Sequence, residues 1–108
     1  MQLKLKVLLV DDEPLVLDAL RELVSREDNY QVDVAENGTI ALNMALREQY
    51  SVIITDLMLR DITGIDLLKS LKLQTPETQV IMMSGKGTID FAVEAMKMGA
   101  FDFLTKPF

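Results

Sequence analysis

The stretch Ser51-Val52-Ile53-Ile54-Thr55-Asp56 decides the fold that this sequence predicts. Its central residues are β-branched and apolar on both pleat faces, which is typical of a strand covered on both sides. The strand ends on a carboxylate, Asp56. Open α/β sheets place their ligand sites at the carboxyl ends of the strands. We therefore predict a buried central strand with a functional aspartate at its end.

Strands and helices alternate outward from this stretch. Apolar or alternating patterns predict strands at 3–10, 31–36, 51–56, 78–84 and 101–105. Helical spacing predicts helices at 14–26, 39–48, from a cap at Thr63 to just before Pro76, and 88–98. This alternation indicates βαβ units and a parallel sheet. The first, third and fourth strands are apolar on both faces and should be central. The half-polar second and fifth belong at the edges, which predicts a flavodoxin-like α/β sheet of order 2-1-3-4-5.

The length, charge and composition of the chain exclude several classes of function and of metal site. A chain of 108 residues predicts one domain, and its net charge of -6 argues against direct binding of nucleic acid. No apolar run approaches the length of a membrane span, so a cytoplasmic protein is the expectation. The sequence holds no cysteine and no histidine, which excludes histidine-based catalysis and thiolate or imidazole metal sites. A metal must be bound by oxygen, which favours Mg²⁺, Mn²⁺ or Ca²⁺.

Polar residues that carry chemistry follow four of the predicted strands. Asp11 and Asp12 follow the first, Asp56 ends the third, Ser84 ends the fourth, and Lys106 follows the fifth. In the order 2-1-3-4-5 these ends line one rim, with a crevice between the first and third strands. Carboxylates crowded there repel one another, and Mg²⁺ suits such an oxygen site. With a lysine and a hydroxyl nearby, the rim could stabilise transfer of a phosphoryl group to Asp56.

Each of these residues has an ordinary structural role when it is taken singly. Asp11 or Asp12 alone is more often a helix cap, Asp56 a turn residue, and Lys106 a surface charge. Their convergence on one rim, with complementary charges, is what favours a functional site.

The motifs resemble the receiver domain of two-component response regulators. The matching stretches cover nearly the whole chain: 7–13 (VLLVDDE), 53–58 (IITDLM), 83–85 (MSG) and 103–108 (FLTKPF). The run 87–108 most resembles receivers of the nitrogen-regulation type, which precede an ATPase domain and a DNA-binding domain.

The resemblance implies a role for each matching residue. Asp56 would take a phosphoryl group from a phosphohistidine on a sensor kinase. Asp12 would bind Mg²⁺ directly, Asp11 largely through water, and the backbone carbonyl of Met58 would complete the protein ligands beside Asp56. Lys106 would pair with a phosphoryl oxygen.

The resemblance also implies a conformational switch. Ser84 would move to hydrogen-bond the phosphoryl group, and Phe103, at the aromatic switch position, would turn inward. The sequence departs from the family at Arg60, commonly a proline, and at Thr63, often an aspartate. Both positions lie in the loop after Asp56.

The family continues into a fifth helix, whereas this sequence stops at Phe108. We therefore expect a receiver domain over 1–108 that is truncated before that helix, and apolar area near the fourth and fifth strands that favours association.

The helix predicted at 88–98 carries two apolar stripes. We expect a core stripe of Ile89, Val93 and Met96. A second stripe of Phe91, Ala95 and Met98, with the neighbouring edge strand, would be the surface that meets an output domain or a dimer partner. Its position would shift when Ser84 and Phe103 move.

Three alternatives belong to other classes. A Mg²⁺-dependent phosphatase also uses strand-end aspartates, but the pair at 11–12 is adjacent, whereas haloacid-dehalogenase-like phosphatases have Asp-x-Asp. A nucleotide- or flavin-binding module would need a glycine-rich turn after the first strand. A pseudo-receiver would only bind partners. The complete set of site residues favours a phosphoacceptor that is not an enzyme in its own right.

Overall fold

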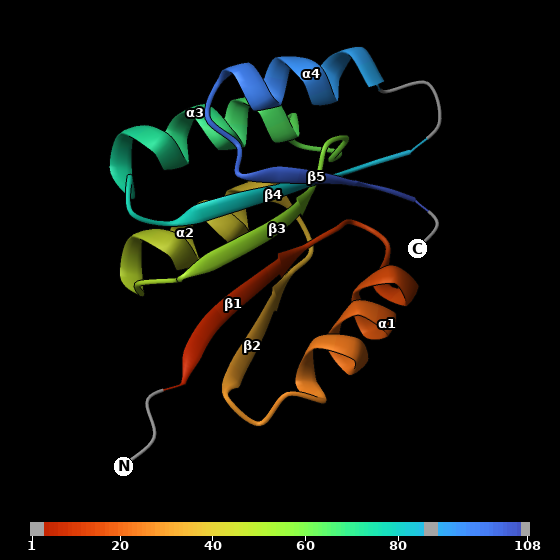
Figure 1. The fold of residues 1–108 in the computed structure, drawn as a ribbon, viewed down its shortest axis with the longest axis vertical. Helices are drawn as coiled ribbons and strands as arrows, with labels where there is room; N and C mark the ends of the chain where they lie inside the picture. The colour runs from red at the N-terminus through yellow and green to blue at the C-terminus, as the bar shows by residue number, and fades with distance from the viewer. Residues whose placement is uncertain (1–3, 86–88, 107–108) are drawn as a thin grey trace.

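A five-stranded parallel sheet in the order β2-β1-β3-β4-β5 forms the centre of the molecule (Figure 1). The structure is a computed structural model, which describes residues 4–85 and 89–106, without the side chain of Ile89. The strands are β1 (Leu5–Val10), β2 (Tyr30–Ala35), β3 (Val52–Asp56), β4 (Gln79–Ser84) and β5 (Asp102–Thr105). The helices are α1 (Pro14–Ser25), α2 (Gly38–Arg47), α3 (Gly64–Gln74) and α4 (Ile89–Lys97). The predicted fold class and strand order are confirmed.

The helices cover the two faces of the sheet unequally. Figure 1 shows α1 on one face, and α2, α3 and α4 on the other. Alternation along β1 sorts its residues between the faces. Leu8 and Val10 belong to the apolar core with α2, α3 and α4, whereas Val7 and Leu9 belong to the core with α1. All four are at most 4% exposed, so β1 is covered on both sides, as the central position predicts.

Side-chain caps fix where two helices begin. The Thr63 hydroxyl accepts a hydrogen bond from the Asp66 backbone N–H at 3.1 Å, which confirms the predicted cap of α3. The Asn37 side chain accepts from the Ile40 N–H at 2.8 Å, so α2 begins at Gly38, one residue before the predicted start. Asn37 is therefore a cap as well as a turn residue.

The two stripes predicted on α4 are wrong in part. Val93 and Met96, expected in the core, are 45% and 38% exposed. The small residues Ala92 and Ala95 are fully buried instead, so Ala95 cannot belong to a partner surface. Met98 is half-buried against the core that α4 covers. The physical reason is size: alanines let a helix approach its neighbours closely, and the bulkier Val93 and Met96 are left at its flanks.

A few predicted features lie outside the described residues. They are the strand start at Leu3, the helix start at Thr88, the side chain of Ile89 and the motif residues Pro107 and Phe108. Across residues 4–85 and 89–106, no helix is long and apolar enough to cross a membrane.

Candidate functional site

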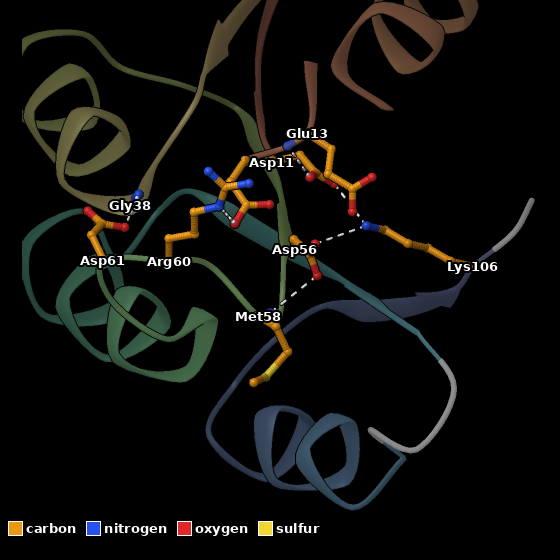
Figure 2. A network of polar contacts seen from close by, with 9 residues as sticks. Asp11, Glu13, Gly38, Asp56, Met58, Arg60, Asp61 and Lys106 are labelled. Atoms are coloured by element: carbon orange, nitrogen blue, oxygen red, sulfur yellow. Dashed lines mark hydrogen bonds and ion pairs between the residues drawn. The ribbon is translucent and has the colours of Figure 1, made fainter. Parts of the chain in front are cut away.

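The carboxyl ends of β1 and β3 and the residue after β5 meet at one point (Figure 2). The Lys106 ammonium group donates to Asp11 Oδ2 and to Asp56 Oδ2, each at 2.9 Å. These partners are separated by 95 and 50 positions in the sequence. The parallel order of the sheet is what brings them together, because it places these ends on the same rim.

Three carboxylates form a group that could hold a metal ion. Asp11, Asp12 and Asp56 each offer one oxygen, and these oxygens lie within 4.8 Å of one another. The Asp11 side chain is fully buried, and those of Asp12 and Asp56 are 16% and 11% exposed. A hard divalent cation prefers carboxylate oxygens and keeps some waters, so a partly open group of this composition fits one.

The group opens into a cavity of about 550 Å³ at the rim. Its lining consists of Asp12, Glu13, Asp56, Met58, Arg60, Gly85 and Lys106. The lining carries charges of both signs, so it suits a small anionic group held together with a cation better than an apolar ligand. The predicted crevice between β1 and β3 is therefore a real hollow in the molecule.

The charge of Lys106 is held in place by its neighbours. Burial by itself lowers the pKa of the Lys106 ammonium group. The hydrogen bonds and the negative charges of Asp11 and Asp56 outweigh that effect, and the pKa of Lys106 lies above its ordinary value. The lysine is consequently a fixed positive charge at neutral pH.

Ser84 places a hydroxyl in the same region without a partner. Its side chain is fully buried, and Oγ has no hydrogen-bond partner in the part of the chain that the structure describes. The Lys106 backbone N–H donates to the Ser84 carbonyl at 2.7 Å, so the two residues are direct neighbours. A buried hydroxyl without a partner is costly. Ser84 does not line the cavity, so a ligand oxygen would satisfy this hydroxyl only if the Ser84 side chain turned toward it.

The loop after β3 is shaped by close backbone contacts. The Met58 N–H donates to Asp56 Oδ1 at 3.2 Å, and Met58 forms an antiparallel bridge with Thr63. The Gly64 N–H donates to the Leu57 carbonyl at 2.8 Å. A Cβ atom at position 64 would lie 2.6 Å from the Asp56 carbonyl oxygen, so only glycine allows α3 to begin here. These contacts fix both Asp56 and the backbone of Met58.

The same loop is tied to α2 by Asp61, a residue that the sequence analysis did not single out (Figure 2). Asp61 Oδ1 accepts from the Gly38 N–H at 3.0 Å, and Oδ2 accepts from the Thr39 N–H and hydroxyl at 2.8 and 2.7 Å. The Thr39 hydroxyl and the neighbouring backbone N–H groups hold the pKa of Asp61 well below its usual range. The partners lie 22 and 23 positions away, so no local pattern could predict the contact.

Replacing Asp61 with alanine is expected to lower the free energy of unfolding by about 1 kcal/mol, because two N–H groups at the start of α2 lose their acceptor. The pKa of Asp61 is lowered by folding, so this contribution is present above the ordinary carboxyl pKa and is lost as the pH falls below about 4. Urea titrations at several pH values measure it. The control is Asp28→Ala, at an exposed aspartate in a turn. Equal losses of unfolding free energy for the two variants would show that the contact of Asp61 with α2 does not stabilise the fold.

Phe103 and Phe91, which were expected to transmit a switch, do not line the cavity at the rim. Phe103 is half-buried and packs against the core covered by α4. Phe91 is 47% exposed. A second hollow, of about 230 Å³, lies between α4 and the loop after β3 and is lined by Leu57, Met58, Thr63, Ile65, Phe91 and Glu94. The loop after β3 and α4 therefore face each other across this hollow.

Comparison with known proteins decides the family. The model of the response regulator receiver domain matches residues 7–108. The chain belongs to the response regulator receiver family. This receiver sequence is 38% identical over 102 residues to the response regulator protein PilR of Pseudomonas aeruginosa, covering 94% of this chain and 23% of that protein. It is 38% identical over 110 residues to a putative NtrX-like response regulator of Rickettsia felis, covering 97% of this chain and 22% of that protein. The receiver sequence thus spans about a quarter of these relatives' length.

Solved receiver structures have the same fold. The signal receiver domain of a putative Luxo repressor protein from Vibrio parahaemolyticus has a TM-score of 0.91 and 34% identity, over 98% of this chain and 81% of that one. NtrX from Brucella abortus in complex with ADP has a TM-score of 0.90 and 32% identity, over 98% of this chain and 24% of that one. A third structure is that of a response regulator from Burkholderia pseudomallei with a phosphorylated aspartic acid, calcium ion and citrate. It has a TM-score of 0.87 and 30% identity, over 97% of this chain and 61% of that one. The predicted resemblance, including its nitrogen-regulation type, is confirmed.

Proposed function

We propose that residues 1–108 form a phosphoacceptor receiver domain and that Asp56 accepts a phosphoryl group from a phosphohistidine of a sensor kinase. The observation that carries this proposal is the pairing of Asp56 Oδ2 with Lys106 at 2.9 Å, inside a cluster of three carboxylates. A phosphorylated aspartic acid in the Burkholderia pseudomallei relative supports it. The role is signalling, and the domain assists only its own phosphorylation and dephosphorylation.

The metal of this proposal is Mg²⁺, bound by Asp11, Asp12, Asp56 and the backbone carbonyl of Met58. The oxygen-only donor set and the 4.8 Å spread of the three carboxylate oxygens fit a small hard cation. The calcium ion in the Burkholderia pseudomallei structure is a related oxygen-seeking cation. When bound, such a cation neutralises negative charge on the carboxylates and on a phosphoryl group.

The chain's own residues account for the transfer step. A carboxylate oxygen of Asp56 attacks phosphorus, the bond from phosphorus to the histidine nitrogen breaks, and that nitrogen leaves with the bonding electron pair and takes a proton from solvent. Lys106, already within hydrogen-bond distance of Asp56, is positioned to pair with a phosphoryl oxygen. The buried Ser84 hydroxyl supplies a second donor. Both act on charge that develops during transfer, which is how phosphoryl transfer is accelerated.

The output of the domain lies on the face formed by α4 and β5. Ser84 moves toward the phosphoryl group, and Phe103 packs further inward. The surface that an output domain or a second copy reads consists of Phe91, Val93 and Met96 on α4 with Leu104 on β5, which are 47%, 45%, 38% and 39% exposed. The domain acts in the cytoplasm, and the transcriptional regulatory proteins among its relatives support control of transcription as the final effect.

Treatment with a small phosphodonor such as acetyl phosphate tests the proposal. In the presence of Mg²⁺, intact-mass spectrometry is expected to detect the addition of one phosphoryl group, and peptide mapping should place it on Asp56. Chelation of the divalent cation should strongly reduce the modification. Continuous release of inorganic phosphate from an added phosphate ester, without a labelled protein, would favour a phosphatase. No modification under any condition would favour a pseudo-receiver.

A further inference from the structure

Arg60 reaches back over the cavity from the loop after β3. Its Nε lies 3.4 Å from Asp12 Oδ2, and the Arg60 side chain is 82% exposed. Arg60 also lines the 550 Å³ cavity together with Asp12, Asp56 and Lys106. In the view of Figure 2, Arg60 and Lys106 approach the carboxylates from opposite sides. The cavity therefore has two cationic side chains with very different degrees of burial.

These two cations divide the carboxylates between them. Lys106 pairs with Asp11 and Asp56, each at 2.9 Å. Within the described parts of the chain, the ion pair of Asp12 is with Arg60. Because Lys106 is held by two hydrogen bonds at an enclosed position, it is the fixed charge. Arg60 is in contact with solvent over most of its surface and can leave Asp12 at small cost.

The backbone on either side of Arg60 is anchored. Met58 bridges to Thr63, and Asp61 accepts hydrogen bonds from Gly38 and Thr39 at the start of α2. The loop therefore cannot carry Arg60 far from the cavity. The position of Arg60 over Asp12 follows from the tie between the loop and α2, while its guanidinium remains free to move.

We propose that Arg60 is a tethered counter-ion that competes with the divalent cation for Asp12 and so weakens the affinity of the receiver for that cation. This inference rests on the metal site of the proposed function. An ammonium or guanidinium group and a metal ion both seek the same carboxylate oxygen, and close approach of the two cations is unfavourable. Binding of the metal consequently moves Arg60 away from Asp12, toward solvent at the mouth of the cavity.

Calorimetric titration of the intact receiver with MgCl₂ tests this role. Because an exposed ion pair contributes little, Arg60→Gln is expected to lower the Kd for Mg²⁺ by about two- to fivefold. Arg26→Gln is the matched control, because it removes the same charge from an exposed arginine whose partner is Glu22 on α1, at 3.7 Å. Arg26→Gln should change the Kd by less than about half of the effect of Arg60→Gln, since distant surface charges are screened.

The possible outcomes separate the two proposals. Tighter binding by Arg60→Gln alone supports competition at Asp12. Equal changes in both variants would mean that only net charge matters, and an unchanged or weaker affinity in Arg60→Gln would mean that Arg60 does not compete. Either result overturns the role of Arg60 and leaves the metal site intact. If the wild-type receiver binds no Mg²⁺, the metal site itself is wrong, and the role of Arg60 fails with it.

Discussion

Asp56→Asn is expected to abolish the addition of a phosphoryl group on treatment with acetyl phosphate and Mg²⁺. The amide that replaces the carboxylate is a far weaker nucleophile, and it removes the negative charge that Lys106 faces at 2.9 Å. Asp11 cannot take over, because it is fully buried and is already bonded to Lys106 and to the Glu13 N–H. Asp12 faces the same cavity, but in the proposed site its carboxylate is bound to the metal. We therefore expect complete loss, measured as the fraction of intact protein that carries the added mass.

Asp61→Asn is the matched control for this loss, because it makes the same chemical change in the same loop. Asp61 bonds to the start of α2 and does not line the cavity, so this variant should be phosphorylated to the same final extent as the wild type. Circular dichroism should confirm that both variants are folded. Retained phosphorylation of Asp56→Asn at another side chain would contradict the assignment of the acceptor.

The strand order of the sheet could be predicted because the burial of a strand is visible in the apolar pattern of consecutive residues. Val7, Leu8, Leu9 and Val10 are apolar in succession, and a run of this kind requires cover on both faces. Only two terminal positions of the sheet were then available for the half-polar strands, and β2 and β5 occupy them. Once the strand order was set, the carboxyl ends had to converge, and Asp11, Asp12, Asp56 and Lys106 lie together as predicted.

The face of α4 that packs against the sheet could not be predicted from local sequence patterns. Its sequence offers apolar residues on more than one face, and the larger ones were expected inside. The structure buries Ala92 and Ala95 instead, because the distance between helix and sheet decides how large a buried side chain can be. That distance depends on contacts from other elements, which no window of the α4 sequence contains.

Hydrogen bonds and ion pairs between residues far apart in the chain could not be predicted from the sequence either. The Tyr50 hydroxyl donates to Asp33 Oδ2 at 2.7 Å across 17 positions, and its burial together with that contact raises the pKa of Tyr50. Asp61 meets α2 across 22 and 23 positions. Arg60 was noted only as a departure from the family, and its contact with Asp12 required the loop conformation. Each of these side chains is individually ordinary in the sequence.

Lys106→Met is expected to lower the free energy of unfolding by about 2 kcal/mol when no divalent cation is present. Removing one partner from a buried ion pair costs about 3 to 5 kcal/mol, and partial solvent exposure of Lys106 reduces that figure. Asp11 and Asp56 would be left close together without their shared counter-ion. Methionine keeps the apolar stem, so the loss reports the charge. Urea unfolding in the presence of a chelator measures it.

The Lys106→Met effect should depend on pH and on Mg²⁺ in defined directions. Folding raises the pKa of Lys106, so its stabilisation is fully present below the unfolded pKa of about 10.5 and is lost only as the pH rises through the higher folded value. Saturating Mg²⁺ should reduce the loss, because a bound divalent cation stabilises the folded state and compensates the same carboxylates.

Phosphorylation of Lys106→Met should fall more than its affinity for Mg²⁺, since the lysine acts on the phosphoryl oxygen and not as a metal ligand. Lys97→Met, an exposed lysine of α4 that forms no ion pair among the described residues, is the charge-matched control and should leave stability and phosphorylation nearly unchanged. Parallel loss of phosphorylation and of Mg²⁺ affinity in Lys106→Met would contradict this separation of roles. Unchanged stability in the chelator would show that the bridge to Asp11 and Asp56 does not hold the two strand ends together.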